Sequence, residues 1–332
     1  LRSNHIFMKK IIYLFIVSIL FSCTKEQEKV KLSGPVFGTA FNIQYYTYDN
    51  ANYEKEFDSL YDIVNASMST YIPGSKISRI NKGETVEVDE HFKRVFNTAK
   101  RIYRETEGAF DPTIGAVVNA WDFGPEGKIT NIDSTAIDSL MKSVGFNKMG
   151  LVNNKIVKNS HSFLDFNAIA KGYGVDVIAE FLESKNIKDY LVEIGGEIRV
   201  KGINLEKKSS WKVGLDEPRF DGEQSVYRAL GLKDQAMATS GTYRKFKIDE
   251  NGNRYAHIIN TKTGHPTKTN ILSVSVIASD CMTADAYATA FQAMGIEKVT
   301  KFAQSHPELK IYFIYETDLN ELKTFGLNNF PE

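Results

Sequence analysis

The spacing of apolar residues changes along this chain, and that change limits the folds it can adopt. In the first half, apolar residues recur every three or four positions, the spacing of amphipathic helices. Stripes of this kind occupy residues 57–68, 92–103 and 137–144. Beyond Gly195, short apolar or alternating runs follow one another, as in antiparallel strands. Helices combined with runs of such strands indicate an α+β fold rather than a regular βαβ array.

Further elements are expected around these regions. An opening strand is predicted at 36–46, and helices at 168–183, 282–294 and 296–305. Asp133 or Ser134 can cap the helix that begins near residue 134, and Gly145 can end it. The strand-like runs lie at 155–157, 163–166, 190–194, 197–200, 211–215, 227–232, 243–248, 271–278 and 310–315.

The domain organisation predicted from the sequence is simple. The chain has 332 residues, enough for one large domain or two ordinary ones, but no linker divides it after residue 33. We therefore expect one domain over 33–332. No G-x-G-x-x-G motif joins a strand to a helix, which excludes a Rossmann platform. Lysine plus arginine equals aspartate plus glutamate, 41 each, so no nucleic-acid partner is expected.

The N-terminal segment has the pattern of a secretory signal. Two lysines after Met8, the predicted true start, precede an apolar run over 11–21, too short for a transmembrane helix of about 20 residues. Leu20-Phe-Ser-Cys23 resembles a bacterial lipobox. We expect a signal peptide over 1–22, a lipidated Cys23 and a solvated tether over 23–32. This places the protein outside the cytoplasm, lipid-anchored on the periplasmic side of a bacterial membrane; the alternative is an ordinary secretory signal cleaved elsewhere. Cys281 is the only other cysteine, so no disulfide is expected within one mature chain.

The stretch Thr283-Ala-Asp-Ala-Tyr-Ala-Thr-Ala290 carries the sharpest chemical signal. Asp285 and Thr289 are four residues apart in a predicted helix, so their side chains share one face. A carboxylate and a hydroxyl are the hard oxygen donors that Mg²⁺ prefers, and the surrounding alanines leave room for a bulky ligand. The alternative is an acidic first turn that favours the helix dipole.

Five other segments combine glycine, hydroxyl and charged residues. Each also has an ordinary explanation: Asp165 can cap a helix, Lys171 can be a solvated charge, and His257 can be a structural histidine. The segments are Phe37-Gly-Thr-Ala-Phe41, Met68-Ser-Thr-Tyr71, Gly108-Ala-Phe-Asp-Pro-Thr-Ile-Gly115 with Trp121-Asp-Phe-Gly124, Leu164-Asp-Phe-Asn-Ala-Ile-Ala-Lys-Gly-Tyr173, and His257-Ile-Ile-Asn-Thr-Lys-Thr-Gly-His-Pro266.

Taken in order, these motifs resemble one family. Phe110-Asp-Pro-Thr-Ile-Gly115, Ile169-Ala-Lys-Gly-Tyr173, Ala238-Thr-Ser-Gly241, His257-Ile-Ile, Thr263-Gly264 and Thr283-Ala-Asp285 through Thr289 are similar in order and spacing to those of the ApbE family, the FAD:protein FMN transferases. The resemblance implies one domain built from two similar α+β halves, with mixed, mostly antiparallel sheets and flanking helices. It also implies Mg²⁺-dependent transfer of FMN from FAD to a threonine or serine hydroxyl of a partner protein, with release of AMP.

The resemblance assigns roles residue by residue. Asp285 and Thr289, with the backbone carbonyls of Ala168 and Ala288, match the metal ligands. His257 matches the histidine given a catalytic role, which Asp285 shares through the metal. The flavin-nucleotide positions are Phe37, Ser69, Thr70, Tyr71, Ala109, Asp165, Lys171 and Ile259.

Three positions depart from the commonest family pattern. Asn167 stands where glycine is frequent, Asn260 where aspartate is frequent, and Glu197 where aspartate is frequent. Asn167 puts a side chain where the backbone would approach the ligand, and Asn260 removes a possible carboxylate. Glu197 is expected to have no consequence.

Two other functions fit the same residues. The protein can be a Mg²⁺-dependent FAD diphosphatase, with water as the acceptor, or a flavin-binding lipoprotein without catalysis. The second has no use for Asp285, Thr289 or His257. For the transferase, the implied partner is a membrane redox subunit or a secreted flavoprotein.

Overall fold

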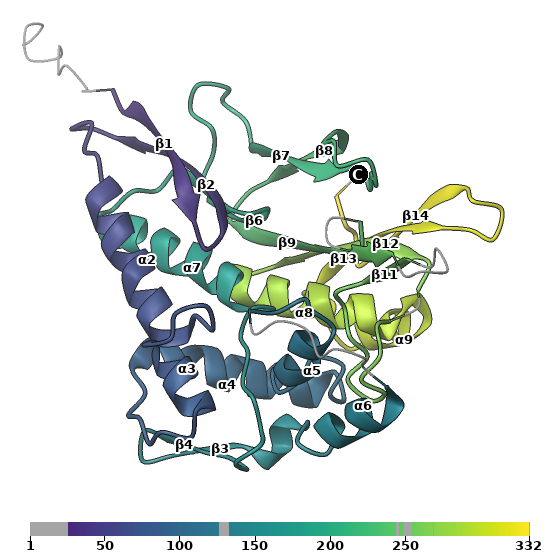
Figure 1. Cartoon of the computed structure of the whole chain (residues 1–332). Helices are drawn as coiled ribbons and strands as arrows, with labels where there is room; N and C mark the ends of the chain where they lie inside the picture. Colours follow the sequence, from purple (N-terminus) through teal and green to yellow (C-terminus); the bar gives the residue numbers. More distant parts are fainter. Residues whose placement is uncertain (1–25, 126–132, 244–245, 249–253, 268, 332) are drawn as a thin grey trace, which may run out of the picture.

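One eight-stranded sheet forms the centre of the molecule (Figure 1). The computed structural model describes residues 26–125, 133–243, 246–248, 254–267 and 269–331, so the predicted signal segment and Cys23 lie outside the described residues. Every strand pairing within the sheet is antiparallel. In spatial order the strands are β1 (Glu28–Val36), β2 (Thr39–Thr47), β5 (Tyr190–Ile194), β6 (Glu197–Lys201), β9 (Gln235–Gly241), β12 (Ile271–Ala278), β13 (Lys310–Glu316) and β14 (Leu322–Leu327).

Three two-stranded sheets accompany the central one. They pair β3 (Gly150–Val152) with β4 (Lys155–Val157), β7 (Trp211–Asp216) with β8 (Val226–Leu232), and β10 (Phe246–Ile248) with β11 (Arg254–Ala256). Together with the helices they confirm the predicted α+β fold with mostly antiparallel sheets.

The helices form layers below the central sheet. Figure 1 shows α7 and α8 side by side under the sheet, with α3, α4 and α5 below them. Among the helices that the structure describes, none has the length and apolar composition needed to cross a bilayer. The helices are α2 (Glu54–Met68), α3 (Lys76–Asn81), α4 (Glu90–Glu105), α5 (Gly115–Ala120), α6 (Ser134–Met141), α7 (Ala170–Ser184), α8 (Cys281–Met294) and α9 (Ile296–Ala303), with a 3-10 turn at Phe146–Lys148.

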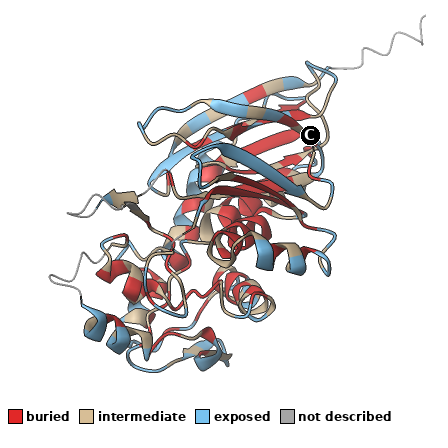
Figure 2. Ribbon diagram, turned by 90° about the vertical axis from the view of Figure 1, so that its right-hand side faces the viewer, coloured by how far each residue is buried: buried red, intermediate tan, exposed pale blue. Residues whose placement is uncertain are grey.

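Both faces of the sheet are covered, by different elements. Along β5, Tyr190 and Val192 pack with the helices, whereas Leu191 packs with Trp211 and Leu230 of the β7–β8 hairpin. This alternation follows from the two-residue period of a strand. Figure 2 shows buried residues concentrated in the sheet and in the helices beneath it. Because α8 contacts β9, β12, α7, α4 and α9, it is the central helix of the core.

The predicted helical stripes are confirmed. The stripe of α4 is buried, and Asp89 caps that helix by accepting a hydrogen bond from the Phe92 N–H at 2.8 Å. Asp133 caps α6 in the same way, through the Ala136 N–H at 2.8 Å. This helix ends at Met141, before the predicted stop at Gly145.

Several sequence-based boundaries were wrong. The predicted strand at 163–166 is an extended segment in which only Phe163 forms a bridge, to Ile114, because the rest turns to enter α7. The predicted strand at 243–248 is confirmed only for β10, and residues 244–245 lie outside the described part. Short elements that lack a full apolar period were missed, namely α3, α5, β3, β9, β11 and β14.

The folded domain also begins earlier than the sequence predicted. Residues 24–32 were expected to be a solvated tether before a domain starting at 33, but β1 begins at Glu28. Val30 is buried, while Lys29 forms an ion pair with Glu206 at 2.8 Å. A charged segment can be an edge strand because only one of its faces is covered, and edge lysines oppose aggregation.

Candidate active site

Asp285 lies in the buried middle of the molecule, on α8, with 6% of its surface exposed. The helix begins at Cys281, and its N-cap is Asp280, whose carboxylate accepts from the Thr283 N–H at 2.8 Å. The first turn of α8 contains no acidic residue. The alternative explanation, an acidic first turn, therefore does not apply to Asp285, which lies one turn further in.

The carboxylate of Asp285 meets the start of α7. The Gly172 N–H donates to its Oδ2 at 3.0 Å. A Cβ on Gly172 would lie 2.4 Å from the Cys281 carbonyl oxygen and 2.8 Å from the Asp285 Cβ. The glycine of the Ala-Lys-Gly-Tyr motif is thus required so that the backbone of α7 can approach α8.

This contact satisfies a backbone donor at the start of α7. Gly172 is the third residue of the helix, so its N–H has no acceptor carbonyl within the helix. The Asp285 carboxylate accepts from it instead. Thr289 lies one turn along α8, partly buried, on the same face as Asp285.

These groups fit a cation that prefers oxygen ligands. Among the residues that the structure describes, no three His, Cys, Asp or Glu side chains form a group that could hold a metal ion. A metal here would depend on Asp285, on Thr289 and on the carbonyls of Ala168 and Ala288. One carboxylate with neutral oxygens is a typical protein share of a Mg²⁺ site, which leaves positions for water or phosphate.

The electrostatics of the site favour a bound cation. Burial raises the pKa of the Asp285 carboxyl, and the Lys171 ammonium and the Gly172 N–H oppose that shift. Burial likewise raises the pKa of Glu197, which lies 2.6 Å from the Lys171 Nζ. The two buried carboxylates thus share one lysine, and further positive charge would stabilise both in their ionised form.

A second group of predicted residues meets at the end of α2. Asn167 Nδ2 donates to Asp165 Oδ2 at 3.1 Å and lies 3.5 Å from the Thr70 Oγ1. Partial burial and the Asp165 carboxylate raise the pKa of Tyr71, a residue that is 59% exposed. The Asn167 side chain thus links the segment of Asp165 to that of Thr70. The Ser69 carbonyl accepts from Ser75 Oγ at 2.7 Å, which fixes this loop.

Phe37 packs against α7, close to the start of that helix. It occupies the β1–β2 turn with a φ of 48° and packs edge-on against Tyr61, with ring centroids 5.5 Å apart. A Cβ on Gly174 would lie 2.6 Å from the Phe37 ring. Because Gly174 and Lys171 are three residues apart on α7, Phe37 lies beside the Lys171 face of that helix.

The remaining predicted site residues, Ala109, His257 and Ile259, lie on two segments that contact each other. Thr261 Oγ1 donates to the Gly108 carbonyl at 2.6 Å, which joins the turn before Ala109 to the segment after His257. His257 is half-buried, directly follows β11, and lies 6.3 Å from the Phe123 ring, centroid to centroid. The side chain of Ile259 is buried in an apolar cluster with residues of α5 and α6, so a nucleotide contact would fall to its backbone.

A cavity of about 370 Å³ opens beside Ala109. It lies between the end of α4, the turn after Ile259, and the adjoining ends of α8 and α9. Its lining consists of Glu105, Thr106, Glu107, Ala109, Asn260, Thr261, Lys262, Ala293, Met294, Lys298, Lys301 and Phe302.

The Phe-Asp-Pro-Thr motif has a structural role. Asp111 is buried, and its Oδ1 accepts from the Thr113 N–H at 2.8 Å and hydroxyl at 2.6 Å. The Pro112 carbonyl accepts from the Asp165 N–H at 2.8 Å. The motif therefore connects the turn that carries Ala109 to the Asp165 segment.

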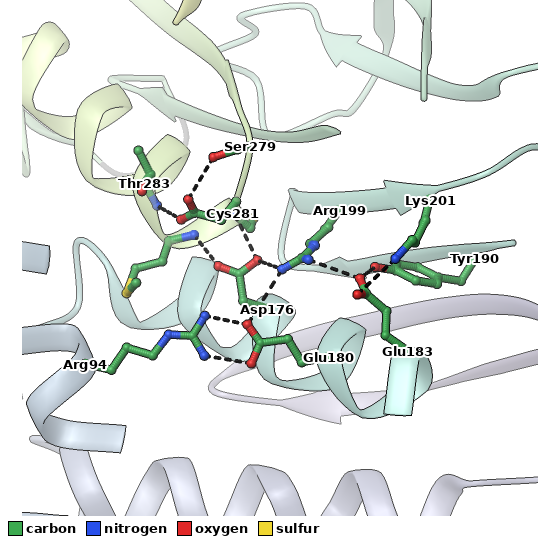
Figure 3. Close-up of polar contacts among 12 residues, drawn as sticks. Arg94, Asp176, Glu180, Glu183, Tyr190, Arg199, Lys201, Ser279, Cys281 and Thr283 are labelled. Atoms are coloured by element: carbon green, nitrogen blue, oxygen red, sulfur yellow. Dashed lines mark hydrogen bonds and ion pairs between the residues drawn. The ribbon is translucent and has the colours of Figure 1, made fainter. Parts of the chain in front are cut away.

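Asp176 was missed by the sequence analysis, yet it holds the start of α8 (Figure 3). It is fully buried on α7 and accepts from the N–H groups of Cys281 at 3.0 Å and Met282 at 2.8 Å. Arg199 donates to the same carboxylate at 2.8 Å and to Glu183 at 3.1 Å. Burial raises the pKa of Asp176 to about 6, with Arg199 opposing the shift. The sequence signal that could have revealed Asp176 was an acidic residue inside an apolar stretch of the predicted 168–183 helix.

Replacing Gly172 with alanine tests the close approach of the two helices. At an exposed helix position this change would stabilise by about 1 kcal/mol. Here we expect a loss of about 1–3 kcal/mol, typical of overpacking, together with lower activity, because α7 must move away from Asp285. Urea unfolding measures the first effect. Gly150→Ala is the control, since nothing lies within 4 Å of its added Cβ; equal stabilisation of both variants would contradict the packing argument.

Comparison with known proteins places the chain in a family. The ApbE family model matches residues 37–313. The chain is 37% identical to the FAD:protein FMN transferase of Haemophilus influenzae, covering 90% of both chains. It is 36% identical to that of Vibrio cholerae, covering 94% of this chain and 95% of the relative.

Solved structures show the same fold. The flavin transferase ApbE from Vibrio cholerae superposes with a TM-score of 0.81 at 36% identity, covering 90% of this chain and 97% of that one. The ApbE protein from Thermotoga maritima gives 0.77 at 26% identity, with 89% and 96% covered. By the extent of the family match, by sequence identity and by fold, this chain belongs to the ApbE family.

Proposed function

We propose that this chain transfers the FMN part of FAD to a threonine or serine hydroxyl of an acceptor protein and releases AMP. The observation that carries the proposal is the Asp285–Thr289 face of α8, where the buried carboxylate meets the start of α7 at Gly172, directly after Lys171. The relatives named FAD:protein FMN transferase support the same reaction. A reservoir that only binds flavin would gain nothing from a buried carboxylate, which is costly to bury without a cation.

The transfer exchanges the phosphoanhydride bond of FAD for a phosphoester bond to the acceptor. The acceptor hydroxyl oxygen bonds to the FMN phosphorus, the P–O bond to the AMP phosphate breaks, and AMP leaves with the electron pair of that bond. The hydroxyl proton must be removed, and His257 is our candidate base because histidine titrates near neutral pH. Lys171 would place its ammonium by the diphosphate oxygens.

We propose Mg²⁺ as the metal of this site, held by Asp285, Thr289 and the carbonyls of Ala168 and Ala288. When bound, it would neutralise negative charge on the diphosphate as the transition state forms. We propose that Tyr71, which is exposed, and Phe37 offer apolar surface to the flavin ring. Ala293, in the lining of the cavity, is eight residues from Asp285 on α8, about 12 Å along the axis. That distance suits the adenosine end of FAD.

Nucleotide analysis separates transfer from hydrolysis. The protein is incubated with FAD and Mg²⁺, with and without a secreted or membrane flavoprotein that has a threonine-containing flavin-attachment segment, and AMP and FMN are quantified. Transfer predicts AMP only when acceptor is present, without free FMN. Equal AMP and free FMN in the absence of acceptor would instead identify an FAD diphosphatase. FAD that survives with Mg²⁺ and a verified acceptor would contradict both.

We also propose that lipid on Cys23 anchors the protein on the periplasmic side of a bacterial membrane. Four residues, 24–27, separate Cys23 from β1. Glu28 is thus five residue steps from Cys23, and each step spans at most about 3.5 Å, so this tether would keep the start of the domain within about 18 Å of the membrane surface, which suits a membrane-associated redox acceptor. We expect Cys23→Ala to move the protein from the membrane fraction to the soluble periplasmic fraction. Retention of this variant in the membrane would contradict the anchor.

A further inference from the structure

Glu197 is a buried acid on the central sheet whose role the sequence did not predict. It begins β6 directly after Gly195 and Gly196, which have φ values of 61° and 101°. Glu193 stabilises this tight turn by accepting from the Gly196 N–H at 2.7 Å. The side chain of Glu197 is 4% exposed and extends to the first turn of α7, where it meets Lys171.

Only one of the two carboxylate oxygens of Glu197 contacts Lys171. Oε1 lies 2.6 Å from the Lys171 Nζ. Oε2 is buried and has no hydrogen-bond partner among the described residues. A buried carboxylate oxygen without a partner is destabilising, and a well-packed apolar residue would usually serve stability better. The pair therefore calls for an explanation other than folding.

A second buried carboxylate lies at the same turn of α7. The N–H of Gly172, the residue directly after Lys171, donates to Asp285 Oδ2 at 3.0 Å. Lysine is long and flexible, and the Lys171 side chain is 34% exposed. Without Glu197, we expect the ammonium to pair with Asp285 and to compete with a metal ion for that carboxylate.

We propose that Glu197 is a positioning residue that holds the Lys171 ammonium away from Asp285, so that Asp285 stays available to a divalent cation and Lys171 stays available to the diphosphate. The catalytic significance of this role for Glu197 rests on the proposed function. The metal and FAD affinities that it predicts can be measured without turnover.

The test is a double-mutant cycle with four proteins: wild type, E197Q, K171M and K171M/E197Q. Glutamine preserves the shape of Glu197 and removes its charge. Since K171M alone leaves Glu197 buried without its cation, the K171M/E197Q protein provides a neutral pair that keeps the fold. Mn²⁺ affinity is measured by electron paramagnetic resonance without FAD, and FAD affinity by quenching of flavin fluorescence.

In the wild-type background we expect E197Q to weaken Mn²⁺ binding about tenfold, within the range of coupling between contacting residues. With methionine at 171 no ammonium can occupy Asp285, so E197Q should then change Mn²⁺ affinity less than about twofold. E197Q should likewise weaken FAD binding when Lys171 is present and change it little when methionine stands at 171.

An equal loss of Mn²⁺ affinity in both backgrounds would overturn the proposal, because Glu197 would then act directly through its charge. Unchanged Mn²⁺ affinity in E197Q would overturn it as well. These outcomes are independent of acceptor and AMP, so a failure of the transferase assay can be told apart from a failure of this proposal.

Discussion

Replacing Asp285 with asparagine should reduce AMP release about a thousandfold while leaving the protein folded. The substitution keeps the side-chain shape and an oxygen that can accept from the Gly172 N–H. It removes the only charged group among the proposed metal ligands. Charge stabilisation by a catalytic metal is worth several kcal/mol, and about 4 kcal/mol corresponds to a thousandfold change in rate. The measurement is AMP release at saturating FAD with increasing Mg²⁺.

The stability of the same variant provides the control. Burial disfavours the charged form of Asp285, so D285N should unfold at an equal or higher urea concentration than wild type when no metal is present. Added Mg²⁺ should raise the unfolding midpoint of wild type but not of D285N. Full activity in D285N, or an equal response of both proteins to Mg²⁺, would show that this face of α8 is not a metal site.

Replacing Asp176 with alanine should cause the largest loss of stability. The change leaves Arg199 without its buried partner and leaves the N–H groups of Cys281 and Met282 without acceptors. Removing one member of a buried ion pair typically lowers the free energy of unfolding by about 3–5 kcal/mol. Urea unfolding at neutral pH measures this loss.

Asp133 offers a matched comparison, because it is also an aspartate that caps a helix but lies exposed at the start of α6. Asp133→Ala should lower the free energy of unfolding by only about 1 kcal/mol. Similar losses in D176A and D133A would mean that Asp176 acts as an ordinary cap, and that the network with Arg199 contributes little.

The sequence predicted what depends on local spacing. Asp285 and Thr289 were placed on one helix face by their separation of four, and the stripe of α4 followed from its apolar period. The motif Ala-Lys-Gly-Tyr marked the start of α7, although why it needs Gly172 became clear only from the crossing of α7 with α8.

Long-range pairing was beyond sequence reasoning. Glu197 and Lys171 are brought together by the packing of β6 against α7, and no local pattern links them. Asp176 meets the start of α8 across more than a hundred residues of chain. Edge strand β1 was mistaken for a tether because its charged residues hide a single buried face around Val30. Each of these depends on the order of strands in the sheet, which residue spacing alone does not determine.

The most direct test of the proposed reaction is the intact mass of the acceptor after incubation with the protein, FAD and Mg²⁺. We predict an increase equal to FMN less one water, in proportion to the AMP released, and none when the acceptor threonine is replaced by valine. An acceptor of unchanged mass, with FAD consumed or intact, would contradict the account.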